Sequence, residues 1–319
     1  MLIVPEALIA DLVSFDDAFA AVEGCFASMA RGDAYNFPVV REALGEGRQY
    51  GFKSGLDRAG AQLGVKAGGY FPGNAARGMI NHQSSVFLFD PDTGRPLAMV
   101  GGNLLTALRT AAAQAISVDR LARKDARVLG MVGAGHQAGF QLRAAARVRK
   151  FERVIAWNLH PDMLPGLGKI AAELGLPFEA VPLERMVEAD VIVTITSAPA
   201  ASLMAAHVKA GTHLACMGTD TKGKQEVEAA LLGRATVFTD EVAQSVSIGE
   251  AQHAVASGLL RAENITPIGD VVIGKHAGRG ADSEITLFDG TGVGLQDLAV
   301  AAMAVTRARE RGLGTEIAV

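Results

Sequence analysis

The stretch VLGMVGAGHQAG, residues 128–139, decides the fold of the larger part of this chain. It begins as an apolar strand, passes through a glycine-rich turn and opens a helix. In such a unit Gly133 permits the tight turn, Gly135 lets the backbone approach a pyrophosphate, and Ala138 keeps helix and strand close. The amino end of the helix attracts phosphate charge. The stretch therefore predicts a dinucleotide-binding site, with a mere tight turn as the alternative.

Downstream of this turn, short apolar segments alternate with helical ones. Parallel strands need crossover connections, so this alternation predicts a parallel sheet covered by helices on both faces. The expected class is α/β, with a doubly wound Rossmann domain. The predicted strands are 127–132, 154–158, 178–181, 191–196, 213–217 and 237–239, and the predicted helices are 137–147, 165–174 and 183–189.

Upstream of the turn the pattern is different. Ser14 is placed to cap an amphipathic helix that ends near Gly32. Residues 37–100 are short apolar stretches broken by Gly, Pro and Asn, which is typical of hairpin strands. A helix over 103–122 leads into the next domain, and an apolar helix over 295–309 returns to the first one. The expected domains are an α+β domain, 1–115 with 295–319, and a Rossmann domain, 116–294.

Composition narrows the class of partner. The formal net charge is −4 and the basic residues are dispersed, so the chain lacks the basic stripe of a nucleic-acid-binding protein. No apolar run approaches the roughly 20 residues of a membrane span, and the first residues do not resemble a signal peptide. Cys25 and Cys216 lie in different contexts and the histidines show no ligand spacing, so we expect no metal site. These features predict a cytoplasmic protein with a small-molecule partner and neither nucleic acid nor membrane.

The strand ends predict which dinucleotide binds. Asn158 ends the second strand, about 20 residues after the turn, where an acidic residue usually holds the adenosine ribose. Asn donates and accepts there, and no Arg follows to hold a 2′-phosphate, so we favour NAD; His160 leaves NADP open. The alternative for Asn158 is a plain strand cap. Thr196 and Ser197, at the end of the fourth strand, are either cofactor contacts or ordinary loop hydroxyls.

Six ordered blocks carry a family resemblance. They are LGVKAGGYFPGN (63–74), FLFDPDTGRPLAMV (87–100), LLTALRTAAAQA (104–115), VGAGHQA (132–138), MGTD (217–220) and SEITLFDGTGVGLQD (283–297). On these blocks the chain resembles the ornithine cyclodeaminase and mu-crystallin family over nearly its whole length. The resemblance implies a homodimer whose N-terminal domains share a mixed sheet, a Rossmann domain, and hydride chemistry on imino or amino acids. The first domain is therefore the expected substrate-binding and dimerisation domain.

The resemblance assigns roles to four charged residues. Arg41, Lys66 and Arg109 fall where the family places the cations that hold the substrate carboxylate, a task that suits a guanidinium fork and a compact ammonium. Asp220 matches the acid that contacts the reacting nitrogen or activates water, so Lys66 and Asp220 are the expected catalytic residues. Taken singly, the basic residues are also explained as solvated or snorkelling charges, and Asp220 as the cap of a helix that starts near Gly223.

The last block holds a turn that matches the family segment lying against the nicotinamide, with Val293 at its centre. This turn is otherwise only a helix entry. The full set of cofactor-binding residues that we expect is Gly133, Gly135, His136, Gln137, Ala138, Asn158, Thr196, Ser197, Met217, Gly218 and Val293.

Two departures from the ornithine enzymes bear on the substrate. Asn158 replaces an acidic residue, and the stretch 79–85, MINHQSS, is more polar than the usual family segment. Extra donors beside the Lys66 strand suit a second carboxylate, because a desolvated dianion needs additional hydrogen bonds. We therefore expect His82 and Gln83 to bind that group, although both are also explained as hydrogen-bonded hairpin residues.

The chain looks most similar to the bacterial family members that reduce iminosuccinate to L-aspartate with NADH, and this is the expected reaction. The alternatives within the enzymes are an ornithine cyclodeaminase, a ketimine reductase and an alanine dehydrogenase. The alternative outside the enzymes is a ligand-binding protein similar to mu-crystallin.

Overall fold

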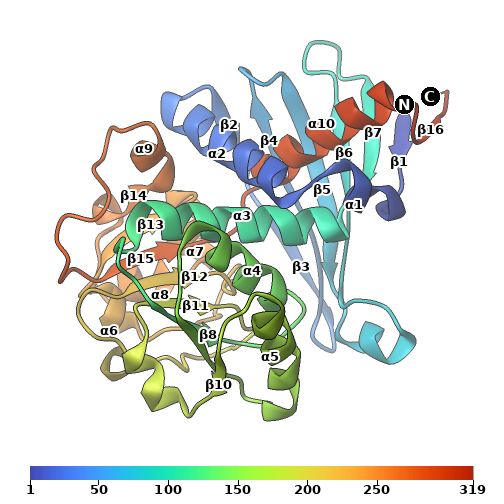
Figure 1. The fold of residues 1–319 in the computed structure, drawn as a ribbon. Helices are drawn as coiled ribbons and strands as arrows, with labels where there is room; N and C mark the ends of the chain where they lie inside the picture. Colours follow the sequence, from blue (N-terminus) through green and yellow to red (C-terminus); the bar gives the residue numbers. More distant parts are fainter. Residues whose placement is uncertain (319) are drawn as a thin grey trace. The chain divides into compact units, whose positions relative to one another are not determined.

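The computed structural model describes residues 1–318, and the chain divides into two compact units (Figure 1). The first unit comprises residues 1–112 and the C-terminal segment from Val293, and the second unit is Ala113–Gly292. The first boundary and the expected one at 115/116 both fall inside helix α3 (Asn103–Leu121). A single helix therefore carries the chain from one unit into the other.

The first unit is built on an eight-stranded mixed sheet. Neighbouring strands are antiparallel except β1 and β7, which are parallel. The hairpin strands expected over 37–100 are confirmed, because β3 to β6 lie in that range and β7 ends one residue beyond it. Across the sheet the strands are β16 (Thr315–Glu316), β1 (Leu2–Val4), β7 (Pro96–Gly101), β6 (His82–Phe89), β5 (Gln62–Tyr70), β4 (Arg48–Asp57) and β2 (Ala34–Asn36), with β3 (Val40–Gly45) also paired to β4.

Two long helices, α2 (Phe15–Arg31) and α10 (Gly294–Glu310), pack against each other and against this sheet (Figure 1). The capped helix expected after Ser14 is confirmed. Ser14 Oγ accepts the Asp17 N–H, the Asp17 carboxylate accepts the Ser14 N–H, and Gly32 ends the helix at φ +81°. The shorter helices of this unit are η1 (Glu6–Leu8), α1 (Ile9–Leu12) and η2 (Pro72–Arg77).

Helix α10 begins so close to the sheet that its first residue has to be glycine. A Cβ on Gly294 would lie 2.7 Å from the backbone nitrogen of Ser54 in β4. Further along α10, Leu298 lies over β5, where a Cβ on Gly64 would come within 2.7 Å of its side chain. The first turn of α10, which includes the fully buried Asp297, is therefore fixed against β4 and β5.

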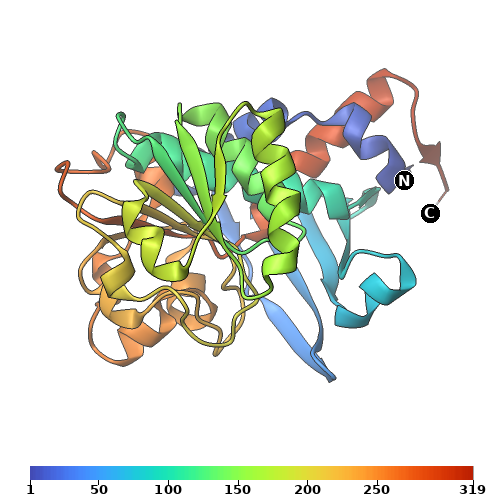
Figure 2. The same ribbon diagram turned by 60° about the horizontal axis from the view of Figure 1, so that its bottom comes forward.

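The second unit is the expected doubly wound domain. All neighbouring strands of its sheet are parallel, and helices flank the sheet (Figure 2). The order of the strands reverses between β8 and β11, which is the arrangement of a dinucleotide-binding domain. Across the sheet the strands are β10 (Phe178–Ala180), β9 (Arg153–Trp157), β8 (Val128–Val132), β11 (Val191–Thr194), β12 (His213–Cys216), β15 (Thr286–Asp289), β13 (Thr236–Thr239) and β14 (Thr266–Pro267).

The helices of this unit follow the predicted alternation with one difference. Residues 183–189 are predicted as a helix, and the structure has a short 3₁₀ helix there, η4 (Leu183–Glu188), between β10 and β11. The α-helices are α4 (Ala138–Val148), α5 (Leu164–Glu173), α6 (Ala229–Leu232), α7 (Val242–Ile248), α8 (Ala251–Ala256) and α9 (Ile268–Val272), and the other 3₁₀ helices are η3 (Pro161–Met163), η5 (Ala205–His207) and η6 (Ala262–Asn264).

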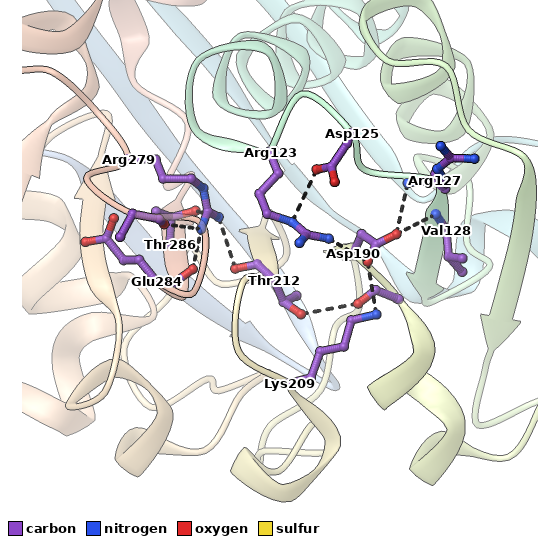
Figure 3. Close-up of polar contacts among 12 residues, drawn as sticks. Arg123, Asp125, Arg127, Val128, Asp190, Lys209, Thr212, Arg279, Glu284 and Thr286 are labelled. Carbon is purple, nitrogen blue, oxygen red and sulfur yellow. Dashed lines mark hydrogen bonds and ion pairs between the residues drawn. The ribbon is translucent and has the colours of Figure 1, made fainter.

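A group of charged side chains, shown in Figure 3, joins the amino ends of the parallel strands in the second unit. Asp190 accepts the backbone N–H groups of Arg127 and Val128 and forms ion pairs with Arg123 and Lys209 at 3.1 and 3.0 Å. The backbone N–H of Arg127 and the Lys209 ammonium hold the pKa of this carboxyl below its ordinary value, although burial opposes them. These contacts stabilise the amino ends of the strands, whereas dinucleotides bind at the carboxyl ends.

Candidate active site

The glycine turn after β8 has the geometry that the sequence predicts. Gly133 adopts φ +111°, and a Cβ there would lie 2.6 Å from the Ile195 carbonyl oxygen, so only glycine fits. A Cβ on Gly135 would meet no described atom within 4 Å. Ala138 is fully buried at the start of α4. These features fit a backbone that closely approaches a phosphate group.

A cavity of about 340 Å³ borders this turn within the second unit. Gly135 and His136 line it on the side of the turn, and Met163 and Leu167 line it on the side of η3 and α5. The wall is mainly apolar. Gly135 and His136 are therefore accessible from this cavity.

Asn158 holds the glycine turn in place. Its Oδ1 accepts the Ala134 N–H at 3.0 Å, and its Nδ2 donates to the His160 carbonyl at 2.8 Å. This is the strand-cap alternative for Asn158. Its contact with an adenosine ribose stays a prediction.

Thr196 and Gly218 are joined by Glu226, a residue that no sequence motif indicates. Glu226 Oε1 accepts the Thr196 N–H and Oγ1–H at 2.6 and 2.8 Å, and Oε2 accepts from Thr194 Oγ1 and Gly218 N at 2.8 and 2.7 Å. Burial raises the pKa of this carboxyl. One side chain thus sets the carboxyl ends of β11 and β12, where the Rossmann fold binds its cofactor.

Three further buried acidic residues, Glu250, Asp289 and Asp240, lie in the second unit. Glu250 accepts the Glu226 and Val227 N–H groups, and burial together with the charge of Glu226 raises its pKa to about 8. Burial raises the pKa of Asp289 to about 7, and Asp240 accepts the Gly292 N–H at 2.7 Å. Asp289 and Asp240 end or follow strands, which is a usable sequence signal; Glu226 and Glu250 lie in connecting segments without a motif.

The remaining predicted residues of the second unit differ in exposure. Asp220 is half-buried, accepts from Thr221 Oγ1 at 3.2 Å and pairs with Lys224 Nζ at 3.3 Å. No helix starts near Gly223, so the helix-cap alternative for Asp220 is wrong. Met217 is buried, whereas Ser197 and Gln137 are accessible. In the first unit, fully buried Val293 directly precedes α10.

The first unit brings two of the predicted substrate cations together around a carboxylate. Lys66 Nζ lies 2.8 Å from Asp297 Oδ2, and Arg109 Nε lies 3.1 Å from Asp297 Oδ1. Arg109 also donates to Gln296 Oε1 at 3.2 Å, and Lys66 to Thr106 Oγ1 at 3.4 Å. We call Lys66, Arg109 and Asp297 the buried ion cluster, since all three are at most 6% exposed.

The charges in this cluster influence one another strongly. Burial and the neighbouring Arg109 guanidinium lower the pKa of Lys66 to about 8, and Arg41 in β3 acts in the same direction. Burial opposes ionisation of Asp297, but Arg109 and Lys66 hold its pKa below the ordinary value. Asp297 stands at the end of the last sequence block, and its only sequence signal is that of a lone acid in the first turn of an apolar helix, which does not by itself predict a role. Buried cations of this kind are typical of an anion-binding site.

His82 and Gln83 face opposite sides of the sheet, because successive side chains alternate along a strand. The pairing of Lys66 with Val86 puts Val86, Ser84 and His82 on the Lys66 side. Gln83 points to the other face, where it donates to the Ile80 carbonyl at 2.9 Å and accepts from Asn103 Nδ2 at 3.2 Å. The structure therefore does not bring Gln83 to the buried ion cluster.

Two general features concern residues 1–318. Within this range no group of His, Cys, Asp and Glu could hold a metal ion, and both cysteines are buried free thiols. In the same range no helix is long and apolar enough to cross a membrane.

Comparison with known proteins places these features in context. A model of the ornithine cyclodeaminase/mu-crystallin family matches residues 3–312. Among curated proteins, the iminosuccinate reductase of Paracoccus denitrificans is 62% identical over 100% of both chains. The alanine dehydrogenase of Archaeoglobus fulgidus is 33% identical over 99% of this chain and 98% of its own.

Solved structures of family members superpose closely on this chain. The crystal structure of the Paracoccus denitrificans iminosuccinate reductase in complex with NAD+ superposes with a TM-score of 0.94 at 62% identity, covering 100% of this chain and 99% of that one. The Thermococcus litoralis Delta(1)-pyrroline-2-carboxylate reductase in complex with NADH and L-proline gives 0.93 at 25% identity, covering 99% and 100%.

Proposed function

The chain belongs to the ornithine cyclodeaminase/mu-crystallin family, and we propose that it is an NADH-dependent reductase that converts iminosuccinate to L-aspartate. The observation that carries this proposal is the 62% identity with an iminosuccinate reductase across the whole of both chains. The buried ion cluster supports it, because it offers cations for an anionic imino acid.

We assign the substrate α-carboxylate to Lys66 and Arg109, with Arg41 adding charge from β3. Asp297 keeps both cations oriented, since it pairs with each of them at about 3 Å, and it favours the ammonium form of Lys66. A planar imino acid bound in this way presents a fixed carbon atom for reduction. We propose that Asp220 supports the proton on the imine nitrogen.

The second unit is the proposed site of the dinucleotide. When bound, NADH supplies the hydride that reduces the carbon–nitrogen double bond. The turn at Gly133 and Gly135 accommodates the phosphates, and Glu226 fixes the neighbouring strand ends at Thr196 and Gly218. We expect NADH to bind more tightly than NADPH, because no Arg follows Asn158.

We also propose that the protein works as a homodimer in the cytoplasm. The related archaeal alanine dehydrogenase structure is described as a dimer, at 33% identity and a TM-score of 0.93. The first unit supports the proposal, since aromatic and aliphatic side chains are exposed on the outer face of its sheet.

The test is an assay of purified protein with NADH, ammonia and a keto acid that forms the imine in solution. With oxaloacetate we expect NADH consumption and formation of aspartate. Alanine dehydrogenase activity is the second candidate, because of the 33% identity with such an enzyme over nearly the whole chain. NADH loss with pyruvate and none with oxaloacetate would establish that candidate and overturn ours. Ammonia release from ornithine without net change in NADH would instead identify a cyclodeaminase.

A further inference from the structure

Lys53 is a buried lysine in the centre of β4 that the family resemblance did not single out. It is 6% exposed and pairs directly with Lys66 across the β4–β5 ladder. Its charge contributes to the low pKa of the nearby Asp297 carboxyl. Like charges directly opposite each other in a sheet are destabilising, and burial adds a desolvation cost. Asp297 supplies one negative charge among the three cations Lys53, Lys66 and Arg109, so positive charge remains in excess there, as expected where an anionic ligand binds.

On the face of the sheet that carries Lys53 and Lys66, the next pair of residues on β4 and β5 has no side chains. Gly51 and Gly68 pair with each other there, next to Arg41, which pairs with Gly51. A Cβ on Gly51 would lie 2.1 Å from the Val40 carbonyl oxygen, and one on Gly68 would lie 2.4 Å from the Gln83 carbonyl oxygen. These positions cannot carry a side chain without a shift of the backbone. Three cations, Arg41, Lys53 and Lys66, thus border a part of the sheet that is bare.

The spacing of the lysines suits a ligand with two carboxylates. Directly opposite residues in an antiparallel pair have Cβ atoms about 4.5–5.5 Å apart, so the two lysine side chains leave the sheet side by side and can reach the two ends of one short ligand. Lys66 is already paired with Asp297 alongside Arg109, which are the groups assigned to the α-carboxylate. The cation next to them on the neighbouring strand is Lys53.

From this arrangement we propose that Lys53 binds the second carboxylate of the substrate and selects four-carbon dicarboxylic imino acids over monocarboxylic ones. The proposal deepens the function proposed above and rests on it. Lys53 takes the role that the sequence suggests for Gln83, because Gln83 lies on the other face of the sheet with its amide hydrogen-bonded to Ile80 and Asn103. His82, on the correct face, pairs with Tyr70 at the far end of β5 from the Lys53 row.

The test measures dissociation constants of two non-reacting probes, succinate and propionate, with NAD+ present. Wild-type protein is expected to bind succinate at least about tenfold more tightly, the effect of one charge-assisted hydrogen bond. Lys53→Met removes the charge at similar length and is expected to abolish this preference, while the propionate constant changes less than about twofold. Lys53→Arg keeps the charge and is expected to retain a preference for succinate.

Lys66→Met is the matched variant on the opposite strand, and it should weaken both probes because it holds the shared α-carboxylate. An unchanged melting temperature and NADH affinity would show that each variant is folded; Lys53→Gln serves if Lys53→Met does not fold. A preference for succinate that survives in the folded variant overturns the role of Lys53, and so does a wild-type protein without that preference. Failure of the proposed function is distinct, because it appears as absence of iminosuccinate turnover in wild-type protein.

Discussion

The carboxylate of Asp297 links two buried cations that come from different elements. Arg109 lies on α3 and Lys66 on β5, and each reaches one oxygen of the same carboxyl group. Breaking a buried pair of this kind is costly, because it leaves a charge without compensation. An arrangement with such a cost is explained by ligand binding better than by stability, since apolar residues of similar size would stabilise the fold as well.

The lowered pKa of Lys66 predicts how ligand binding depends on pH. Its ammonium form binds an anion, persists below a pKa of about 8 and is lost as pH rises through that value. Asp297 keeps its charge in this range, because its pKa lies below the ordinary value. We therefore expect the succinate dissociation constant to be flat near pH 6–7 and to rise above pH 8, by up to about tenfold per unit. Titrations in a buffer of constant ionic strength check this.

The same titration of Lys66→Met is the control, because this variant lacks the ammonium group that titrates near pH 8. A succinate constant that stays flat to pH 10 would contradict the assignment of Lys66 to the substrate. Since a bound anion favours the ammonium form, the break for the complex should lie at higher pH than the break for the free protein.

In the parallel sheet of the second unit, buried carboxylates connect neighbouring strands at both their carboxyl and their amino ends. Glu226 joins the carboxyl ends of β11 and β12, whereas Asp190 joins the amino ends of neighbouring strands (Figure 3). The two acids resemble each other in their number of backbone partners. Only the carboxyl edge is where such folds bind dinucleotides.

Substitution of Glu226 and Asp190 by their amides should distinguish an effect on NADH binding from an effect on the stability of the fold. In Glu226→Gln the new NH₂ group faces one of two backbone donors, so either Thr196 or Gly218 loses its acceptor. A lost hydrogen bond to a charged group is worth about 1.5–3 kcal/mol. We expect the NADH dissociation constant, measured by fluorescence, to rise about tenfold or more.

Asp190→Asn is the matched control at the opposite edge. It should lower the melting temperature by several degrees, because Arg123 and Lys209 lose their carboxylate, and should leave NADH affinity unchanged. Equal effects of the two variants on NADH binding would refute a specific role for Glu226.

The outer face of the first unit's sheet exposes a group of large apolar side chains. Tyr35, Val40, Tyr50 and Phe52 are 41, 43, 38 and 40% exposed, and strand pairing places all four on the face opposite to Lys53. A cluster of exposed aromatic side chains is typical of a protein–protein interface. This is the physical basis for the proposed dimer.

Light scattering should accordingly give a mass about twice the 33.1 kDa of one chain. Tyr50→Lys places a charge on this face beside Phe52 and should shift the protein toward monomer. Leu159→Lys, at a residue that is 73% exposed in the second unit, is the control and should remain dimeric. A wild-type protein with the mass of one chain would exclude the dimer.

Much of the fold follows from the sequence alone, because it depends on local chemistry. The cap at Ser14, the glycine turn at Gly133 and the alternation of strands and helices are short-range signals, and the structure contains each of them. The carboxylate-binding role of Lys66 and Arg109 was expected from the family resemblance, and the structure places them in one cluster.

The other residues around Lys66 and Arg109 are brought there by long-range packing. Arg109 and Asp297 are 188 positions apart and meet because Gly294 lets α10 pack onto β4. The opposite faces of His82 and Gln83, and the pairing of Lys53 with Lys66, depend on strand register, where a shift of one residue exchanges the two faces. Register and helix packing are set by long-range contacts, which the local pattern of residues does not contain.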